Sequence, residues 1–161
     1  MKKVVVIGCP GAGKSTFARK LREKTGLPLY HLDLIWHRPD KSHITREAFD
    51  QALDGILKTD SWIIDGNYSR TLELRMKECD TIFFLDLPTA VCLQGAQNRI
   101  GVKREDMPWV EAQMDAEFKA FIMNFAKDER PGIYTLLEKY PDKHTVIFHS
   151  QEQINQYLMQ L

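Results

Sequence analysis

The residues with the clearest chemical purpose lie near the start of the chain. A glycine-rich segment there has the spacing G-x-x-x-x-G-K-S and is followed by Thr16; it consists of Gly8, Cys9, Pro10, Gly11, Ala12, Gly13, Lys14 and Ser15. Glycines let the backbone approach a ligand closely, and successive amide groups can form a nest that binds an anion. In this motif the lysine reaches the β- and γ-phosphates of a nucleoside triphosphate, and the hydroxyl binds Mg²⁺. The spacing therefore predicts nucleotide binding by residues 8–16, with Lys14 also catalytic and Ser15 also a metal ligand.

Carboxylates follow three of the apolar runs in the chain. Asp33 follows residues 29–32, and it could position an attacking hydroxyl or accept its proton, or else cap the next turn. Asp65 and Asp86 each end a later run, where a carboxylate can stand beside a Mg²⁺ ion, usually through water. Asp86 precedes Leu-Pro and has the pattern of a helix cap. We therefore favour Asp65 as the residue of the metal site.

Two aromatic residues lie close to these carboxylates in the sequence. Trp36 and Tyr68 could stack on the base of a nucleotide acceptor, or they could pack as ordinary core and rim aromatics. We include both among the candidate substrate residues and leave the two interpretations open. His31 and His37 have no cysteines or carboxylates around them at metal-ligand spacing, so we interpret them as structural or rim residues.

The elements that must position these residues alternate along the chain. Runs of apolar residues predict five short strands, at 4–7, 29–32, 62–64, 81–85 and 145–148. Helical spacing and stop signals predict helices at 16–24, 45–58, 89–99, from Pro108 onward, 132–139 and at the C-terminal end. In the helix after Pro108, four apolar residues recur at helical spacing and predict a core stripe: Phe118, Phe121, Ile122 and Phe125. The alternation predicts an α/β fold with a parallel, doubly wound sheet that binds its ligands at the carboxyl ends of the strands.

Length and composition limit the classes of function. The 161 residues suit one domain, 1–161, and the 22 basic residues balance the 22 acidic ones. Such a chain has no overall field to attract nucleic acid, and no apolar run is long enough to span a membrane. The three cysteines match neither a disulfide framework nor a zinc pattern, which favours a reducing, cytoplasmic setting.

The ordered set of motifs resembles a known family over nearly the whole chain. The motifs are GCPGAGKST, YHLD, WIIDGNYS, IFFLDLP and the pair Arg130-Pro131. They look like the P-loop proteins known as DNA topology modulation proteins, a group similar to adenylate kinases and to other nucleoside monophosphate and shikimate-type kinases. The resemblance implies a P-loop NTPase fold with a five-stranded parallel sheet flanked by helices. It also implies ATP and Mg²⁺ as cofactors, and a short lid at about 100–107 that carries Lys103 and Arg104.

The resemblance also implies roles for individual residues. Asp33 matches the acidic residue that shikimate-type kinases use on a substrate hydroxyl, and Asp65 matches an aspartate that follows the third strand in adenylate kinases. Arg99 matches a phosphate-contacting arginine at the start of the lid, and Arg130 matches an arginine after it; both are candidate catalytic residues. Adenylate kinases carry an Asp-Gly-Phe-Pro-Arg run where this chain has Asp-Gly-Asn-Tyr-Ser. The nearest arginines, Arg70 and Arg75, are therefore the candidates for binding an acceptor phosphate. Gly95 stands where relatives often have a second arginine.

Together these patterns predict a kinase that transfers the γ-phosphoryl group of ATP to a nucleotide or a small hydroxylated metabolite. The alternative is a regulatory protein in which ATP binding acts as a switch, without a small-molecule acceptor. A DNA-binding function is disfavoured by the balanced charge and the lack of a recognition motif. The sequence leaves open the identity of the acceptor, the choice between ATP and GTP, and the oligomeric state.

Overall fold

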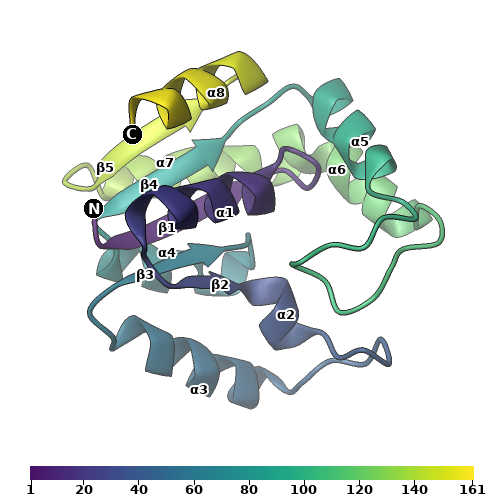
Figure 1. Cartoon of the computed structure of the whole chain (residues 1–161), viewed down its shortest axis with the longest axis horizontal. Coiled ribbons are helices and arrows are strands. Elements are labelled where there is room, and N and C mark those ends of the chain that lie inside the picture. The colour runs from purple at the N-terminus through teal and green to yellow at the C-terminus, as the bar shows by residue number, and fades with distance from the viewer.

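A five-stranded sheet runs through the middle of the protein, which is described by a computed structural model of residues 1–161 (Figure 1). The strands are β1 (Lys3–Gly8), β2 (Leu29–His31), β3 (Trp62–Asp65), β4 (Thr81–Leu85) and β5 (His144–Phe148). They lie in the order β2-β3-β1-β4-β5, and every neighbouring pair is parallel. The predicted five-stranded parallel sheet is therefore confirmed. The central strand β1 is flanked by two others, so its apolar run 4–7 is completely buried.

Helices cover both faces of this sheet. They are α1 (Lys14–Thr25), α2 (Leu32–Trp36), α3 (Arg46–Leu57), α4 (Ser69–Glu78), α5 (Thr89–Asn98), α6 (Ala116–Asp128), α7 (Arg130–Lys139) and α8 (Gln151–Gln160). In Figure 1, α1 and α8 lie in front of the sheet, whereas α4 and α7 lie behind it. None of the helices combines the length and the apolar character that crossing a membrane requires.

The structure corrects three details of the expected elements. β2 ends at His31, and the next residues form the short helix α2, so Asp33 lies in the first turn of a helix rather than after a strand. Helix α4 was not predicted, because Leu72 and Met76 are its main buried apolar residues and the rest of its sequence is polar or charged.

The third correction concerns the helix that was expected to begin at Pro108. Helix α6 begins instead at Ala116, where the side chain of Asp115 accepts a hydrogen bond of 3.1 Å from the amide of Phe118. Proline is common in the first turn of a helix, but here the helix begins where the side chain of Asp115 can cap it. As a result, residues 99–115 form an irregular connection that is longer than the expected lid at 100–107.

Candidate active site

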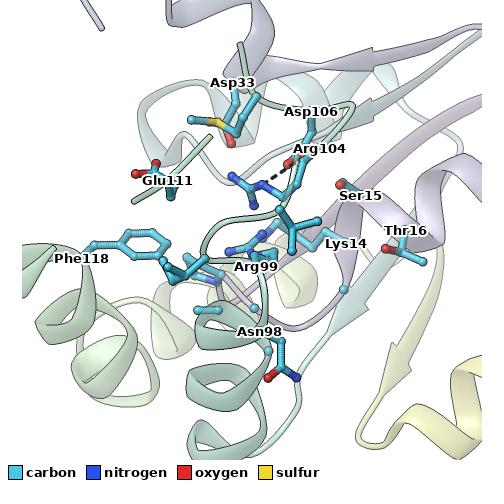
Figure 2. Close-up of a pocket in the computed structure, with 18 of the residues that line it drawn as sticks. Lys14, Ser15, Thr16, Asp33, Asn98, Arg99, Arg104, Asp106, Glu111 and Phe118 are labelled. Carbon is cyan, nitrogen blue, oxygen red and sulfur yellow. Dashed lines mark ion pairs between the residues drawn. The ribbon is translucent and has the colours of Figure 1, made fainter. Parts of the chain in front are cut away.

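A cleft of about 750 Å³ opens at the carboxyl ends of the central strands (Figure 2). Its walls come from the glycine-rich loop, α2, residues 65–68, the end of α5, the connection 99–115 and α6. Ten of the residues expected to act in a site line this cleft: Pro10, Gly11, Gly13, Lys14, Ser15, Thr16, Asp33, Asp65, Tyr68 and Arg99. Segments far apart in the sequence are thus brought around one space.

The glycine-rich loop ends in an uncapped helix terminus. Gly13, the residue before α1, has a left-handed backbone (φ 95°), and no side chain caps the helix. The first hydrogen bond of the helix runs from the amide of Phe17 to the carbonyl of Gly13, at 2.9 Å. The amides of residues 13–16 have no acceptor within the protein. Such free amides at the positive end of a helix dipole form an anion-binding site.

Lys14 adds a cation to this terminus. Its Nζ lies 3.5 Å from the carbonyl oxygen of Cys9, and it forms no salt bridge with a carboxylate. Burial lowers the pKa of Lys14, while the carboxylates of Asp65 and Asp33 act in the opposite direction. A phosphate in the cleft would supply the negative charge that this desolvated ammonium lacks.

The other residues of the loop lie beneath the cleft and support it. Cys9 and Ala12 are buried. The side-chain amide of Asn67 accepts a hydrogen bond from the Gly8 amide (3.1 Å) and donates one to the Gly8 carbonyl (2.7 Å). Asn67 therefore fixes the point at which β1 passes into the loop. The sequence analysis did not single out Asn67, although its place directly after the Asp-Gly pair was a usable signal.

Helix α5 packs with its backbone against the glycine-rich loop. A Cβ on Gly11 would lie 1.8 Å from the carbonyl oxygen of Cys92, and one on Gly95 would lie 2.1 Å from the carbonyl oxygen of Gly11. Real Cβ atoms do not approach backbone oxygens so closely, so both positions require glycine. Gly95 therefore serves close packing between α5 and the loop, which explains why no larger residue stands there.

Asp33 and Tyr68 form a pair at the opposite wall of the cleft. The hydroxyl of Tyr68 donates a hydrogen bond of 2.6 Å to Oδ1 of Asp33. Burial, together with the neighbouring Asp33 carboxylate, raises the pKa of Tyr68, so the phenol keeps its proton and remains the donor. This bond holds Asp33 in the cleft and leaves its other oxygen without a protein donor.

Arg75 holds the turn from which Tyr68 projects. Tyr68 has a left-handed backbone (φ 38°), an unfavourable conformation for a residue with a large side chain. The fully buried guanidinium of Arg75 donates to the carbonyls of Gly66 (2.8 Å), Asn67 and Tyr68 (3.2 Å). Arg75 was a candidate for binding substrate, but the structure places it under the turn and outside the cleft lining.

We expect Arg75→Met to lower the free energy of unfolding by about 3 kcal/mol, because it leaves buried carbonyls without their donors. Urea titration followed by circular dichroism measures this change. Arg70→Met is the matched control on the same helix, since exposed Arg70 pairs only with Asp50 and should cost under about 1 kcal/mol. Equal effects of the two substitutions would contradict the role given to Arg75.

Asp65 fits the requirements of a Mg²⁺ site. Its Oδ2 lies 2.7 Å from Nδ1 of the buried His31, while its Oδ1 is buried without any partner. The hydroxyl-bearing Ser15 lines the same cleft. No three His, Cys, Asp or Glu side chains cluster to hold a metal by themselves. Mg²⁺ bound with a nucleotide takes most of its ligands from phosphates and water.

Asp86, the competing carboxylate, is already engaged. Its oxygens accept hydrogen bonds from Arg130 (2.9 and 3.0 Å) and from Tyr134 (2.7 Å). Neither Asp86 nor Arg130 lines the cleft.

Trp36 also lies outside the lining of the cleft. Its ring stacks on the ring of His43, with 4.4 Å between the ring centres, and packs edge-on against Phe49. Of the two aromatic candidates, only Tyr68 faces the cleft.

Arginines from the irregular connection 99–115 enter the cleft. Nε of Arg99 is buried without a partner, and burial together with the nearby Arg104 lowers the pKa of Arg99. Arg104 pairs with Asp106 at 3.7 Å, and Figure 2 shows this pair between Asp33 and the glycine-rich loop. Two arginines on this wall of the cleft suit an anionic ligand.

The cleft also contains residues that the sequence analysis missed or interpreted differently. Phe118 and Phe121 were expected in the core, but they remain 37% and 39% exposed and line the cleft. Only Ile122 and Phe125 of that stripe are buried. Trp109 and Glu111 come from the connection that was expected to be helical. No local pattern marks these residues, because their exposure depends on where α6 crosses α5.

Comparisons with known proteins support the architecture. No family model matches the chain, and no curated protein matches it in sequence. Among solved structures, shikimate kinase from Acinetobacter baumannii in complex with shikimate matches with a TM-score of 0.65. The match covers 99% of this chain and 90% of that chain, at 16% sequence identity. The chain has the fold of a shikimate kinase. This is a P-loop kinase fold, and it confirms the fold class expected from the sequence.

Proposed function

We propose that the protein is an ATP-dependent kinase that transfers the γ-phosphoryl group to a hydroxyl of a small metabolite. One observation carries the proposal: the free amides and Lys14 at the start of α1 face the same cleft as the carboxylate of Asp33. A site for phosphates and a site for a hydroxyl thus share one space of about 750 Å³. The resemblance to the topology modulation proteins and adenylate kinases supports the same class of chemistry.

The glycine-rich loop is the proposed donor site. The amides of residues 13–16 bind the β- and γ-phosphates, and Lys14 neutralises charge as the γ-phosphoryl group moves. Ser15 and Asp65 would hold Mg²⁺, which would neutralise negative charge on the phosphates. Arg99, with its unpartnered Nε, stabilises negative charge on the transferred group.

Asp33 is the proposed catalytic group of the acceptor site. Phosphoryl transfer needs a group that orients the attacking hydroxyl and takes up its proton. The bond from Tyr68 fixes one oxygen of Asp33, so the other can receive the hydroxyl of the acceptor. Arg104 and Lys103, on the connection that lines the cleft, are in place to close over the phosphates and exclude water.

We expect Asp33→Asn to lower phosphoryl transfer by about 100-fold or more, because the amide cannot accept the hydroxyl proton. The affinity for ATP should stay within about two-fold, since Asp33 lies away from the free amides. Incubation with γ-labelled ATP and a panel of hydroxylated metabolites, nucleosides and nucleoside monophosphates measures transfer, and calorimetry measures ATP binding. Asp54→Asn, on the exposed face of α3, is the control.

The same assay tests the proposal as a whole. Transfer to one acceptor that depends on Lys14 and Asp33 supports the kinase. Tight binding of ATP without transfer to any acceptor would contradict it and favour a nucleotide-dependent switch.

A further inference from the structure

The charges that line the cleft are divided between its two ends. The lysines and arginines among the lining residues all come from the glycine-rich loop, α1 or the stretch 99–104. We define the acceptor end as the lining residues of the stretches 33–37, 65–68 and 107–121. Their lining residues include no lysine or arginine, and besides the proposed metal ligand Asp65 they include three carboxylates: Asp33, Glu111 and Asp115. The acceptor end is therefore acidic, with the imidazole of His37 as its one basic side chain.

Three arginines that the sequence analysis named as site candidates are engaged outside the cleft. Arg70 makes two hydrogen bonds to Asp50, at 2.7 and 3.1 Å. Arg75 is buried and donates hydrogen bonds to backbone carbonyls, and Arg130 donates hydrogen bonds to the carboxylate of Asp86. A kinase that accepts a phosphate or a carboxylate needs a free cation beside it, since an unpaired anion facing several carboxylates is repelled. The arginine shown nearest to Asp33, Arg104, is paired with Asp106 at 3.7 Å and is assigned to the phosphates, so the acceptor end has no cation of its own (Figure 2).

Aromatic side chains and a carboxylate shape the rest of the acceptor end. Phe118, Phe121 and Trp109 line it, and the faces of such rings attract cations. The ammonium of Lys41 already lies 5.9 Å from the centre of the Trp109 ring, which leaves the two phenylalanines for a ligand. Glu111 accepts a hydrogen bond of 3.0 Å from Nε1 of Trp109, and its backbone carbonyl accepts one of 2.7 Å from the amide of Gly101. Glu111 is thus held in place with its second carboxylate oxygen free. In Figure 2, Glu111 and Phe118 lie on the side of the cleft opposite Ser15 and Thr16.

From this arrangement we infer that the acceptor is a hydroxylated amine that carries neither phosphate nor carboxylate. The inference rests on the proposed kinase function and names the substrate class of the same site. The protonated amine binds between the free oxygen of Glu111 and the aromatic rings, while a hydroxyl of the same molecule meets Asp33.

The reaction balances without a further reactant. The hydroxyl oxygen of the acceptor forms a bond to the γ-phosphorus as the bond from that phosphorus to the bridging oxygen of ADP breaks. The electron pair of the broken bond leaves with ADP, and the proton of the hydroxyl passes to Asp33. The amine keeps its proton throughout and serves only for binding.

A fractionated cell extract tests the inference while the acceptor itself is still unidentified. A deproteinised small-molecule extract of the source cells is separated by ion exchange at pH 7 into anionic, neutral and cationic fractions. Each fraction is then incubated with γ-labelled ATP, Mg²⁺ and the full-length protein, with Lys14→Ala as the blank. We expect labelled product from the cationic fraction. Label only in the neutral or anionic fraction would overturn the inference and leave the kinase intact. If no fraction gave labelled product although the protein bound ATP, the result would contradict the proposed kinase function itself.

Glu111→Gln then tests the proposed contact. The amide oxygen of glutamine can still accept the bond from Trp109, so the substitution removes the charge and keeps the local structure. We expect kcat/KM for the labelled acceptor to fall about 10-fold or more, the usual effect of losing a charged hydrogen bond, while KM for ATP changes less than about two-fold. Glu117→Gln, on an exposed position of α6 outside the lining, is the matched control. Equal kcat/KM in the two variants would overturn the role of Glu111.

Discussion

Lys14→Ala is expected to abolish phosphoryl transfer, with a loss of about 10³-fold. The substitution removes the cation that lies among the free amides of residues 13–16, where the β- and γ-phosphates are proposed to bind. Stabilisation of charge in a desolvated site often accounts for rate factors of this size. The ammonium is also desolvated in the protein, and burial lowers the pKa of Lys14. Its removal should therefore leave the fold as stable as before, or slightly more stable.

The measurement is initial-rate transfer of label from γ-labelled ATP, with calorimetry for ATP affinity and circular dichroism for folding. Lys24→Ala, in the last turn of the same helix, is the matched control, because it removes an identical charge from the far end of α1. We expect Lys24→Ala to keep the rate of the unchanged protein within about two-fold. Similar rates for Lys14→Ala and the unchanged protein would show that phosphates do not bind at the start of α1.

The sequence motif placed the glycine-rich loop at the carboxyl end of a strand, where the structure has it lining the cleft, and the reason is local. Gly11, Gly13 and Lys14 belong to one short segment, so their spacing alone indicates the geometry of its backbone. The sheet was predictable for a similar reason, since a strand buried on both faces must be apolar throughout. Asp65 was also found in the cleft lining, because the carboxyl ends of parallel strands meet at one edge.

The acceptor side depends on contacts that no local pattern records. Arg70 and Arg75 lie five residues apart on one helix, yet one pairs with Asp50 at the surface and the other is buried under a turn. Which partner each arginine meets is decided by the packing of α4 against the sheet and α3. Phe118 and Phe121 belong to the same apolar stripe as residues of the core, and only the position of the connection 99–115 leaves them facing a cleft. Such outcomes follow from tertiary structure, so the sequence could not distinguish them.

Gly95→Ala is the second substitution with a large expected effect. Sequence motifs give Gly95 no role, but a Cβ at this position would lie 2.1 Å from the backbone oxygen of Gly11. The oxygen that the Cβ would meet belongs to the backbone of the glycine-rich loop, so it cannot move away by a change of rotamer as a side-chain atom could. Either α5 or the loop must move, at a cost of about 1–3 kcal/mol in the free energy of unfolding. Because the loop is the proposed phosphate site, we also expect affinity for ATP to fall about 10-fold or more.

A second glycine in a helix makes the matched control. Gly55 lies in α3 with open space around its Cα, so a methyl group there meets no atom within 4 Å. Alanine favours a helix over glycine by about 1 kcal/mol, and Gly55→Ala should therefore raise the free energy of unfolding by roughly that amount. Thermal or urea unfolding and ATP titration of both variants give the comparison. The same substitution is thus expected to have opposite effects on stability at two helical positions, and only Gly95→Ala should weaken ATP binding. If Gly95→Ala were as stable as Gly55→Ala and bound ATP equally well, α5 would not be packed against the loop as the structure has it.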